Sequence, residues 1–369
     1  MRIAALVLLA ACGGGSSTPI DSMTPLDSDT ADAVVPSHLV AYISGNAPEI
    51  AWYDFDLATG SLTSAGQAAA WAANPSFLAM TKTHLYGVAE GGDRVGAYSI
   101  EQTTGALSYI NDQSSGGDGP AHLSVDRTGT FVLAANYTNG MIAVLPIRSD
   151  GGVSTAVDTR MAGVNAHMIL TDAANKFVFV PCKGSDYIAQ YQFNATTGAL
   201  TANSPATVMT AAGAGPRHLA FAPNGAFAYV IDENLATLMV FGYDATTGRL
   251  TELQTVSNRA PGATAAGNTG AEVVVHPNGK FVYASNRGDD NVSAFSIGSD
   301  GKVTLVGHVS VGMTPRAFTL DPTGAWMLVA NQGSDTVTTY KIDQTTGLPA
   351  PMGDPIAFTN PSFVGFVSL

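Results

Sequence analysis

Charged, aromatic and imidazole side chains recur at two positions of a repeating pattern in this sequence. One set comprises His122, His167, Arg217, His218, Glu272 and Arg316. The other set comprises Glu90, Asn136, Tyr137, Lys183, Glu233, Asn286, Arg287, Asn331 and Gln332. The whole chain of 369 residues has only 16 Lys and Arg. If the fold gathers several of these cations at one place, they form a local site for an anionic or carbonyl-bearing ligand.

The elements that must position these residues are seven copies of one repeat. Tight turns of the form Thr-Gly or Asp-Gly recur along the chain, and their glycines are Gly60, Gly105, Gly151, Gly198, Gly248, Gly301 and Gly347. Successive glycines are 45, 46, 47, 50, 53 and 46 residues apart. Self-similarity at such a period indicates an array of supersecondary units, of which propeller blades are one kind.

The clearest copy, residues 216–256, divides into four short strands separated by turn signals. The predicted strands are residues 218–222, 226–231, 238–243 and 250–256. Runs such as 227–231 and 281–284 are apolar throughout, as expected for strands packed between neighbouring sheets. Four strands per copy predict a β-propeller, in which four-stranded sheets surround a central channel.

The two ends of the chain are predicted to share one blade. The sequence Asn-Pro-Ser-Phe opens a repeat at residues 74–77 and recurs at 360–363, where only one further strand can follow. The segment from about residue 38 supplies the three missing strands, which pairs edges that would otherwise be exposed. An open β-solenoid would not need this split unit. We therefore expect an all-β fold, a seven-bladed β-propeller of four-stranded antiparallel blades over residues 38–369.

Loops of such a blade alternate between the two faces of the disc. The turns between first and second strands, and between third and fourth strands, share one face and contain plain Asn-Gly, Thr-Gly and Asp-Gly sequences. The loops between second and third strands share the other face with the crossings between blades. Both sets of chemically active residues fall on this second face. The fold therefore predicts one mouth of the channel that is rich in cations.

Several motifs at this mouth together resemble those of a known family. They are Gly215-Pro-Arg-His218, Glu233 sixteen residues after Arg217, Ala271-Glu272, Asn286-Arg-Gly288, and Pro315-Arg316 followed by Ala330-Asn-Gln332. In these motifs the chain resembles the seven-bladed lactonases, which include bacterial 6-phosphogluconolactonase and fungal carboxy-cis,cis-muconate lactonising enzyme. The resemblance covers essentially everything after residue 37. Ala166 and Cys182-Lys183-Gly184 depart from the family's usual Pro and Asp-Leu-Gly, which bears on the substrate more than on the fold.

The resemblance implies that His167, Arg217, Glu233 and Arg287 form the catalytic set. Hydrolysis of a lactone needs a nucleophilic water and stabilisation of an oxyanion. Glu233 or His167 can act as general base if partial burial tunes its pKa toward neutral. One arginine can stabilise the oxyanion while the other forks onto a carboxylate or phosphate. We expect Glu233 to be the base, His167 a proton donor or second base, and both arginines anion clamps.

The remaining mouth residues are expected to contact the substrate. They are His122, Tyr137, Lys183, His218, Glu272, Arg316, Asn331 and Gln332. Structural alternatives stay open for many of these positions. Arg217 and Glu233 can form a salt bridge at a blade edge, and His167 can bond a backbone carbonyl. Arg287 can be an exposed loop cation, and four of the expected substrate contacts can equally serve the fold, namely His122, His218, Asn331 and Gln332.

Composition excludes several other functions. The chain has 29 Asp and Glu and a net charge of −13, so it repels phosphate backbones and no nucleic-acid partner is expected. No apolar run reaches the ~20 residues that span a bilayer. The sequence has no zinc-type His/Cys spacing, calcium loop or phosphate-binding Gly-Lys-Ser/Thr motif, so we expect neither metal nor cofactor. Cys182 is expected to be a buried thiol.

The first residues predict export from the cytoplasm. Arg2 precedes a short apolar run, and Leu9-Ala-Ala-Cys12 resembles the bacterial lipobox, which implies a signal peptide at 1–11 and lipidation of Cys12. Residues 12–37 are rich in Gly, Ser, Thr, Asp and Pro and are typical of a flexible tether. We expect a monomeric, extracytoplasmic bacterial lipoprotein that meets the membrane only through this anchor. An ordinary cleaved signal is the alternative.

Two classes of function remain at this stage. One is a lactonase that opens a sugar-acid or carboxylated lactone outside the cytoplasm. The other is a non-catalytic propeller that binds a small ligand or a protein partner at the same mouth, since a fold does not imply a function. The four-residue set favours the enzyme. The export signal and the scarcity of cations weigh against a phosphorylated sugar, because sugar phosphates are chiefly cytoplasmic.

Overall fold

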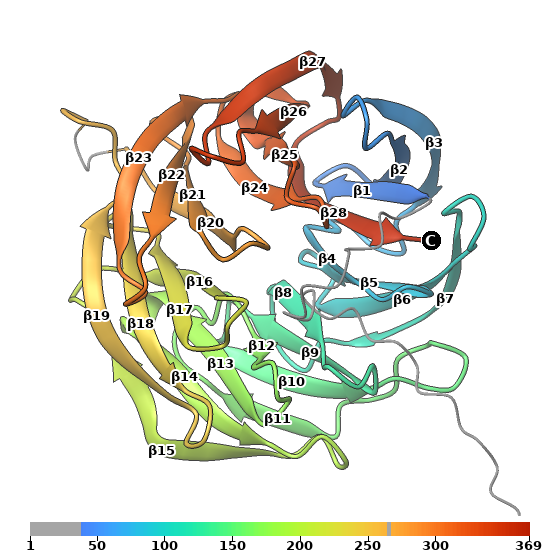
Figure 1. Cartoon of the computed structure of the whole chain (residues 1–369). Helices are drawn as coiled ribbons and strands as arrows, with labels where there is room; N and C mark the ends of the chain where they lie inside the picture. Colours follow the sequence, from blue (N-terminus) through green and yellow to red (C-terminus); the bar gives the residue numbers. More distant parts are fainter. Residues whose placement is uncertain (1–37, 264–266) are drawn as a thin grey trace, which may run out of the picture.

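The structure is a computed structural model, and it describes residues 38–263 and 267–369. Seven four-stranded antiparallel sheets form a ring around a central channel (Figure 1). This confirms the predicted seven-bladed β-propeller. The predicted signal segment 1–11, the lipidation site Cys12 and the tether 12–37 lie outside the described residues. Within the described residues, no helix has the length and apolar character to cross a membrane.

Blade 1 is built from both ends of the chain, in the order β28–β1–β2–β3. Its strands are β28 (Pro361–Ser368), β1 (Leu39–Gly45), β2 (Glu49–Phe55) and β3 (Leu62–Ala69). β1 pairs antiparallel with β28, with Leu39 opposite Ser368. The predicted sharing of one blade by the two chain ends is therefore confirmed (Figure 1).

The other six blades follow in chain order, and the first strands of neighbouring blades contact one another around the channel. Blade 2 contains β4 (Phe77–Met80), β5 (His84–Ala89), β6 (Arg94–Ile100) and β7 (Leu107–Ser114). Blade 3 contains β8 (Pro120–Val125), β9 (Phe131–Asn136), β10 (Met141–Pro146) and β11 (Asp158–Met161). Blade 4 contains β12 (Leu170–Thr171), β13 (Phe177–Cys182), the 3₁₀ turn η1 (Lys183–Ser185), β14 (Tyr187–Phe193) and β15 (Leu200–Met209).

The last three blades have the same plan. Blade 5 contains β16 (Pro216–Phe221), β17 (Phe227–Asp232), β18 (Thr237–Asp244) and β19 (Arg249–Ser257). These bounds agree with the predicted strands to within two residues. Blade 6 contains β20 (Gly270–Val275), β21 (Phe281–Asn286), β22 (Asn291–Ile297) and β23 (Val303–Ser310). Blade 7 contains β24 (Pro315–Leu320), β25 (Trp326–Asn331), the 3₁₀ turn η2 (Gln332–Ser334), β26 (Thr336–Ile342) and β27 (Pro349–Ala357).

The hydrophobic core is divided among the seven interfaces between blades. Each interface holds one apolar cluster that draws on both neighbouring sheets. Between blades 5 and 6, for example, Tyr229 and Ile231 pack with Val273 and Val282. The second strands of the blades are buried on both faces, and this explains their continuous apolar runs.

The repeating glycine marks a contact between neighbouring blades. Gly248 has a φ of +67° and lies against the ring of Phe177, which begins the second strand of the preceding blade. Gly301 lies in the same way against Phe227, and its carbonyl accepts a 3.0 Å hydrogen bond from the Tyr229 hydroxyl. A Cβ at either glycine would overlap the ring. The period read from the sequence is thus the period of the packing between blades.

This contact predicts unequal effects of two glycine substitutions. Gly248→Ala should lower the free energy of unfolding by about 3 kcal/mol, because a strained φ and a collision with Phe177 act together. Gly225→Ala is the matched control, since Gly225 has a φ of +66° with no other atom within 4 Å of a Cβ. Gly225→Ala should lower the free energy of unfolding by only about 1 kcal/mol. Urea denaturation measures both, and equal losses would contradict a role for the contact between blades.

Candidate active site

A β-bulge at the start of most innermost strands brings two consecutive side chains to the channel. In blade 5, Pro216 pairs with Asp232 and His218 pairs with Ile231, so Arg217 is the extra residue. Blades 1, 3, 6 and 7 have register shifts at the equivalent place. A bulge re-aims the side chain it carries. Neighbours in sequence, such as Arg217 and His218, can therefore both serve one site.

Equivalent positions of the seven repeats form two layers across the channel. The upper layer, toward the mouth, is Ser76, Ala121, His167, Arg217, Ala271, Arg316 and Ser362. The floor layer is Phe77, His122, Met168, His218, Glu272, Ala317 and Phe363. Rings from different blades meet in the floor layer. The centroids are 4.2 Å apart for Phe77 and His122, from adjacent blades, and 5.9 Å apart for Phe77 and His218, from blades 2 and 5. The floor layer therefore narrows the channel beneath the mouth.

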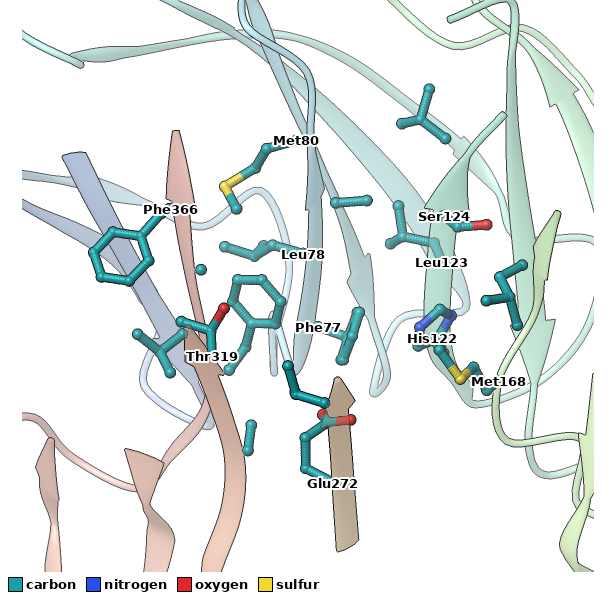
Figure 2. A pocket seen from close by; sticks show the side chains of 18 of the residues that line it. Phe77, Leu78, Met80, His122, Leu123, Ser124, Met168, Glu272, Thr319 and Phe366 are labelled. Carbon is teal, nitrogen blue, oxygen red and sulfur yellow. The ribbon is translucent and has the colours of Figure 1, made fainter. Parts of the chain in front are cut away.

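A largely apolar cavity of about 380 Å³ lies on the other side of this floor. Six of the seven floor residues line it, and none of the upper layer does. Figure 2 shows Leu78, Met80 and Phe366 around this cavity, with Glu272 at the opposite end from Met80. Of the residues predicted to contact substrate, only His122 and Glu272 border it. The cavity is therefore separate from the cation-rich mouth.

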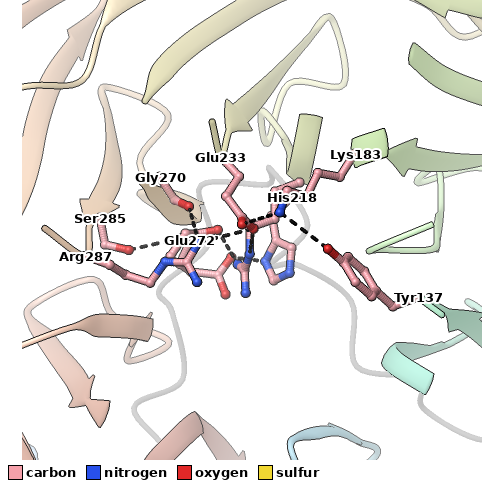
Figure 3. Close-up of polar contacts among 10 residues, drawn as sticks. Tyr137, Lys183, His218, Glu233, Gly270, Glu272, Ser285 and Arg287 are labelled. Atoms are coloured by element: carbon pink, nitrogen blue, oxygen red, sulfur yellow. Dashed lines mark hydrogen bonds and ion pairs between the residues drawn. The ribbon is translucent and has the colours of Figure 1, made fainter. Parts of the chain in front are cut away.

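Glu233 gathers three cations from three blades at the mouth (Figure 3). Its Oε1 atom is 2.6 Å from Lys183 Nζ. Its Oε2 atom is 3.3 Å from Arg217 Nε and 3.1 Å from Arg287 Nη2. Glu233 follows β17, Lys183 lies in η1 after β13, and Arg287 follows β21. The predicted convergence of second-strand ends with first-strand starts is present here, and the alternative of an Arg217–Glu233 salt bridge is confirmed.

Backbone groups of the neighbouring loops hold these side chains in place. The carboxylate of Asp186 accepts hydrogen bonds from the amides of Gly213 (2.7 Å) and Gly215 (2.9 Å), which fixes the crossing that leads into β16. Arg217 Nη1 donates to the carbonyl of Ala271. Arg287 Nη2 donates to the carbonyl of Gly270 at 3.2 Å, as well as meeting Glu233. The guanidinium groups are therefore preorganised without a ligand.

The pKa of Glu233 contradicts one expectation drawn from the sequence. Burial raises the pKa of its carboxyl group, but the charges of Arg217, Arg287 and Lys183 outweigh burial and lower this pKa to about 2. The expectation that burial tunes Glu233 toward neutral is therefore wrong. A carboxylate this acidic is a weak general base near neutral pH. In this geometry Glu233 positions the cations.

Three neutral imidazoles lie beside the cation cluster. The ring centroid of His218 is 5.1 Å from that of His167 and 5.6 Å from that of His122. Burial, and then the nearby cation of Arg217, hold the pKa of His167 and of His218 well below 6.5. Burial, followed by the proximity of His218 and Arg217, does the same to the pKa of His122. All three rings are therefore uncharged at neutral pH.

Buried nitrogen atoms of this group lack protein partners. His218 Nδ1 is 2.8 Å from Glu272 Oε1, but His218 Nε2 has no hydrogen-bond partner among the described residues. His167 Nδ1 and Arg287 Nε are unpartnered in the same sense. Burial raises the pKa of Glu272 to about 7. Buried polar atoms without partners need a water or a ligand.

The cluster suits an anion better than a metal ion. In the described part of the chain, no group of three or more His, Cys, Asp or Glu is arranged to hold a metal. Arg217, Arg287 and Arg316 also face the imidazoles closely enough to lower the pKa of His167 and His218, so a further cation would be repelled.

Arg316 is the cation left uncommitted at the mouth. Among the described residues, the Arg316 side chain forms neither an ion pair nor a hydrogen bond. Burial lowers the pKa of Arg316, and the charge of Glu90 partly offsets this effect. Tyr137 lies nearby, with its hydroxyl 3.4 Å from Lys183 Nζ and its ring centroid 5.5 Å from that of His167. A ligand at the mouth would meet Arg316 as a free guanidinium group.

Two residues predicted to contact substrate serve the fold instead. The buried amide of Asn331 donates to the Thr338 hydroxyl at 3.2 Å within blade 7. Gln332 Nε2 donates to Asn360 Oδ1 at 2.8 Å, and so ties blade 7 to blade 1. The prediction that their side chains bind substrate is therefore not supported by this arrangement. Cys182 is buried, as expected, and burial raises the pKa of its thiol to about 12.

Sequence reasoning missed the aromatic part of the floor. Phe77 and Phe363 were used only to recognise the first strands of two blades, yet their rings are 4.9 Å apart and Phe77 contacts His122. The signal was present in the repeat, because both residues occupy the position of His122 and His218. Aligning all seven copies by that position would have identified the floor layer.

Comparison with known proteins supplies the family. The family model of the seven-bladed β-propeller lactonases matches residues 38–366. The chain belongs to this lactonase family. The resemblance found in the sequence is thus confirmed, and the protein is a lactonase-like hydrolase. The chain is 34% identical over 296 residues to a 6-phosphogluconolactonase of Pectobacterium carotovorum, a match that covers 80% of this chain and 88% of the relative.

Two further members show how far the likeness extends. A Bacillus subtilis 6-phosphogluconolactonase is 33% identical over 293 residues, covering 75% of this chain and 82% of the relative. The solved structure of a periplasmic gluconolactonase from Pseudomonas aeruginosa superposes with a TM-score of 0.83 at 28% identity, covering 90% of this chain and 99% of that one. The lactonase fold is thus shared over nearly the whole propeller.

The ion-pair cluster of this lactonase predicts a pH-dependent loss of stability. Glu233→Gln should lower the free energy of unfolding by about 3 kcal/mol near pH 7, because it leaves cations without their partner in a partly buried site. The native pKa of Glu233, about 2, lies below its ordinary 4.5, so its contribution is complete above pH 4.5 and declines as the pH falls toward 2.

Urea denaturation of both proteins across this pH range measures the effect. The difference in unfolding free energy between wild type and variant should shrink steadily below pH 4.5. Glu252→Gln changes an exposed carboxylate of β19 and should stay within about 0.5 kcal/mol at every pH. A difference for Glu233→Gln that does not vary with pH would show that ion pairing does not produce it.

Proposed function

We propose that this protein hydrolyses the lactone of an unphosphorylated sugar acid and releases the open-chain acid. The observation that carries the proposal is the mouth itself, where, among the described residues, Arg316 forms no ion pair and Arg287 Nε has no hydrogen-bond acceptor beside the neutral imidazoles. Such a site offers donors to an oxyanion and proton acceptors to a water.

The charge arrangement supports an unphosphorylated substrate. Among the described residues of the mouth, Lys183, Arg217 and Arg287 pair with Glu233, and Arg316 is the cation without an ion pair. One guanidinium group can balance the single negative charge of an oxyanion or a product carboxylate. A phosphate dianion carries two negative charges and needs more than one cation to balance them. The named relatives include both a 6-phosphogluconolactonase and a periplasmic gluconolactonase, and the charges favour the second kind of substrate.

In the proposed reaction, the arginines, an imidazole and Glu233 have separate roles. Arg287 Nε donates to the carbonyl oxygen as negative charge develops there, a role worth about 3 kcal/mol of barrier. Arg316 holds the hydroxyl groups or the product carboxylate. A neutral imidazole accepts a proton from the attacking water and returns it to the ring oxygen when the ester bond breaks. Glu233 stays ionised throughout and positions the guanidinium groups.

A lactone panel tests this function directly. The wild type should open glucono-δ-lactone well above the uncatalysed rate and faster than its 6-phosphate, with a muconolactone and an acyl-homoserine lactone as comparisons. Arg316→Ala should raise KM at least ~10-fold, because a charge-assisted hydrogen bond to the substrate is lost. Arg249→Ala removes a cation from the outer strand β19 and should change neither KM nor kcat.

The outcomes separate the two classes of function. Turnover of glucono-δ-lactone that depends on Arg316 supports the proposed enzyme. Calorimetric binding of gluconate without turnover of any lactone would replace it with a non-catalytic propeller that binds a ligand at the same mouth. Faster turnover of the 6-phosphate would assign the phosphorylated substrate.

We infer further that the protein is an extracytoplasmic lipoprotein anchored to the membrane through its N-terminal segment. Arg2, the apolar run after it and Cys12 support lipidation. The first strand of each blade runs from the mouth to the opposite face, and the end of β28 meets the start of β1, where the Leu369 amide donates to the His38 carbonyl at 3.0 Å. An anchor preceding His38 would therefore attach on the face opposite the mouth.

Cell fractionation tests the anchor. Cys12→Ser should move the protein from the membrane fraction to the soluble fraction, because the lipid attachment point is lost. Cys182→Ser replaces a buried thiol and should leave the distribution unchanged. Membrane association of the Cys12→Ser protein would exclude a lipid on this residue as its anchor.

A further inference from the structure

We propose that His218 is the general base of the hydrolysis and that Glu272 is the residue that positions it. This proposal rests on the proposed lactone hydrolysis and deepens it. It replaces the expectation, drawn from the sequence, that Glu233 takes the proton. It also places the base in the floor layer, one residue beyond Arg217.

The geometry of the pair is that of an imidazole backed by a carboxylate. His218 Nδ1 is 2.8 Å from Glu272 Oε1, and the two side chains are only 3% and 11% exposed. The position of Glu272 is fixed as well. Its carboxylate accepts a hydrogen bond from the backbone amide of Val273 at 3.0 Å, and its own backbone amide donates to the Ser285 hydroxyl at 3.0 Å. An ionised Glu272 thus fixes the hydrogen of His218 on Nδ1 and leaves the Nε2 lone pair free.

Among the described residues, the Nε2 atom of His218 has no structural role. His218 Nε2 is buried and has no protein partner among the described residues, so a water or a substrate must satisfy it. The rings of Phe77, His122 and His167 pack against the His218 ring. The other candidate bases of the site fit less well. Glu233 is held ionised by three cations, and among the described residues no carboxylate forms an ion pair with His167 that would fix its tautomer.

The proposed step balances as follows. The water oxygen forms a bond to the lactone carbonyl carbon, and its proton passes to His218 Nε2. The π electrons of the carbonyl move to its oxygen, beside Arg287. When the oxyanion collapses, the bond between that carbon and the ring oxygen breaks. The ring oxygen takes the proton from Nε2, so the products are a hydroxy acid and an unchanged imidazole.

The His218–Glu272 pair also predicts how the activity depends on pH. Burial raises the pKa of Glu272 to about 7, while burial and then the charges of Arg217 and Arg316 hold the pKa of His218 well below 6.5. The remaining groups that face His218 are the carboxylate of Glu233, the cation of Arg287 and the neutral rings of His122 and His167. Below pH 7 a protonated Glu272 donates to Nδ1, and the imidazole hydrogen moves to Nε2. The activity kcat/KM should therefore rise with pH through about 7.

Kinetics of matched variants test the proposal on the lactone that the wild type hydrolyses. His218→Asn should lower kcat by ~10²-fold or more with KM changed by less than about threefold, because a proton acceptor is lost and binding is not. Glu272→Gln should also lower kcat and should abolish the rise near pH 7, since an amide does not titrate. His308→Asn makes the same substitution on the outer strand β23 and should match the wild type.

A second measurement does not depend on activity. Nitrogen-15 NMR of the histidine side chains should show His218 protonated on Nδ1 and unprotonated on Nε2 above pH 7, and the reverse tautomer below it. In Glu272→Gln this exchange of tautomers with pH should disappear. Both measurements use the full chain.

Each outcome decides the proposal. If the wild type hydrolyses a lactone and His218→Asn retains kcat within about threefold, the proposal for this pair fails while the proposed function stands. If His218 carries its hydrogen on Nε2 above pH 7, the pair is also excluded as the base. If no lactone is hydrolysed, both proposals fall. Loss of kcat in His218→Asn together with the predicted tautomer establishes the pair.

Discussion

The pairing of β1 with β28 joins the two ends of the chain into one sheet, and the rest of the molecule depends on this closure. Each blade buries its faces only against its two neighbours. An unclosed ring would leave two apolar sheet faces exposed, because every other cluster is already shared between adjacent blades. Closure also fixes the width of the channel. The distances between side chains of different blades are therefore a property of the whole ring.

Closure gives an acidic protein one place where cations meet. The chain carries a net charge of −13, yet Lys183, Arg217 and Arg287 converge on a single carboxylate. Like charges would not stay together in a partly buried site without that anion. Glu233 therefore acts as a structural counter-charge for the mouth. Its low pKa follows from the same pairing.

The β-bulges at the starts of the innermost strands place consecutive side chains in two different layers of the channel. The upper layer presents the guanidinium groups of Arg217 and Arg316 and the ring of His167 to the mouth. The floor layer presents two imidazoles, Glu272 and aromatic rings. Burial near cations keeps the imidazoles neutral, while burial outweighs the nearby charge of Arg217 and raises the pKa of Glu272. Consecutive residues such as Arg217 and His218 thereby acquire different environments.

By itself, the sequence determined the fold, the number of blades and the face that carries the site. Gly248 and its six equivalents are spaced by the repeat because each packs on the preceding blade, so the period was visible without coordinates. Only the tertiary structure decided which residues act together. Asn331 and Gln332 stood in the expected positions but bond within and between blades, and Glu233 could not be distinguished from a base until its three partners were known. The physical reason is that periodicity is a local property of the chain. A pKa and a hydrogen-bond partner depend on atoms that ring closure brings from other blades.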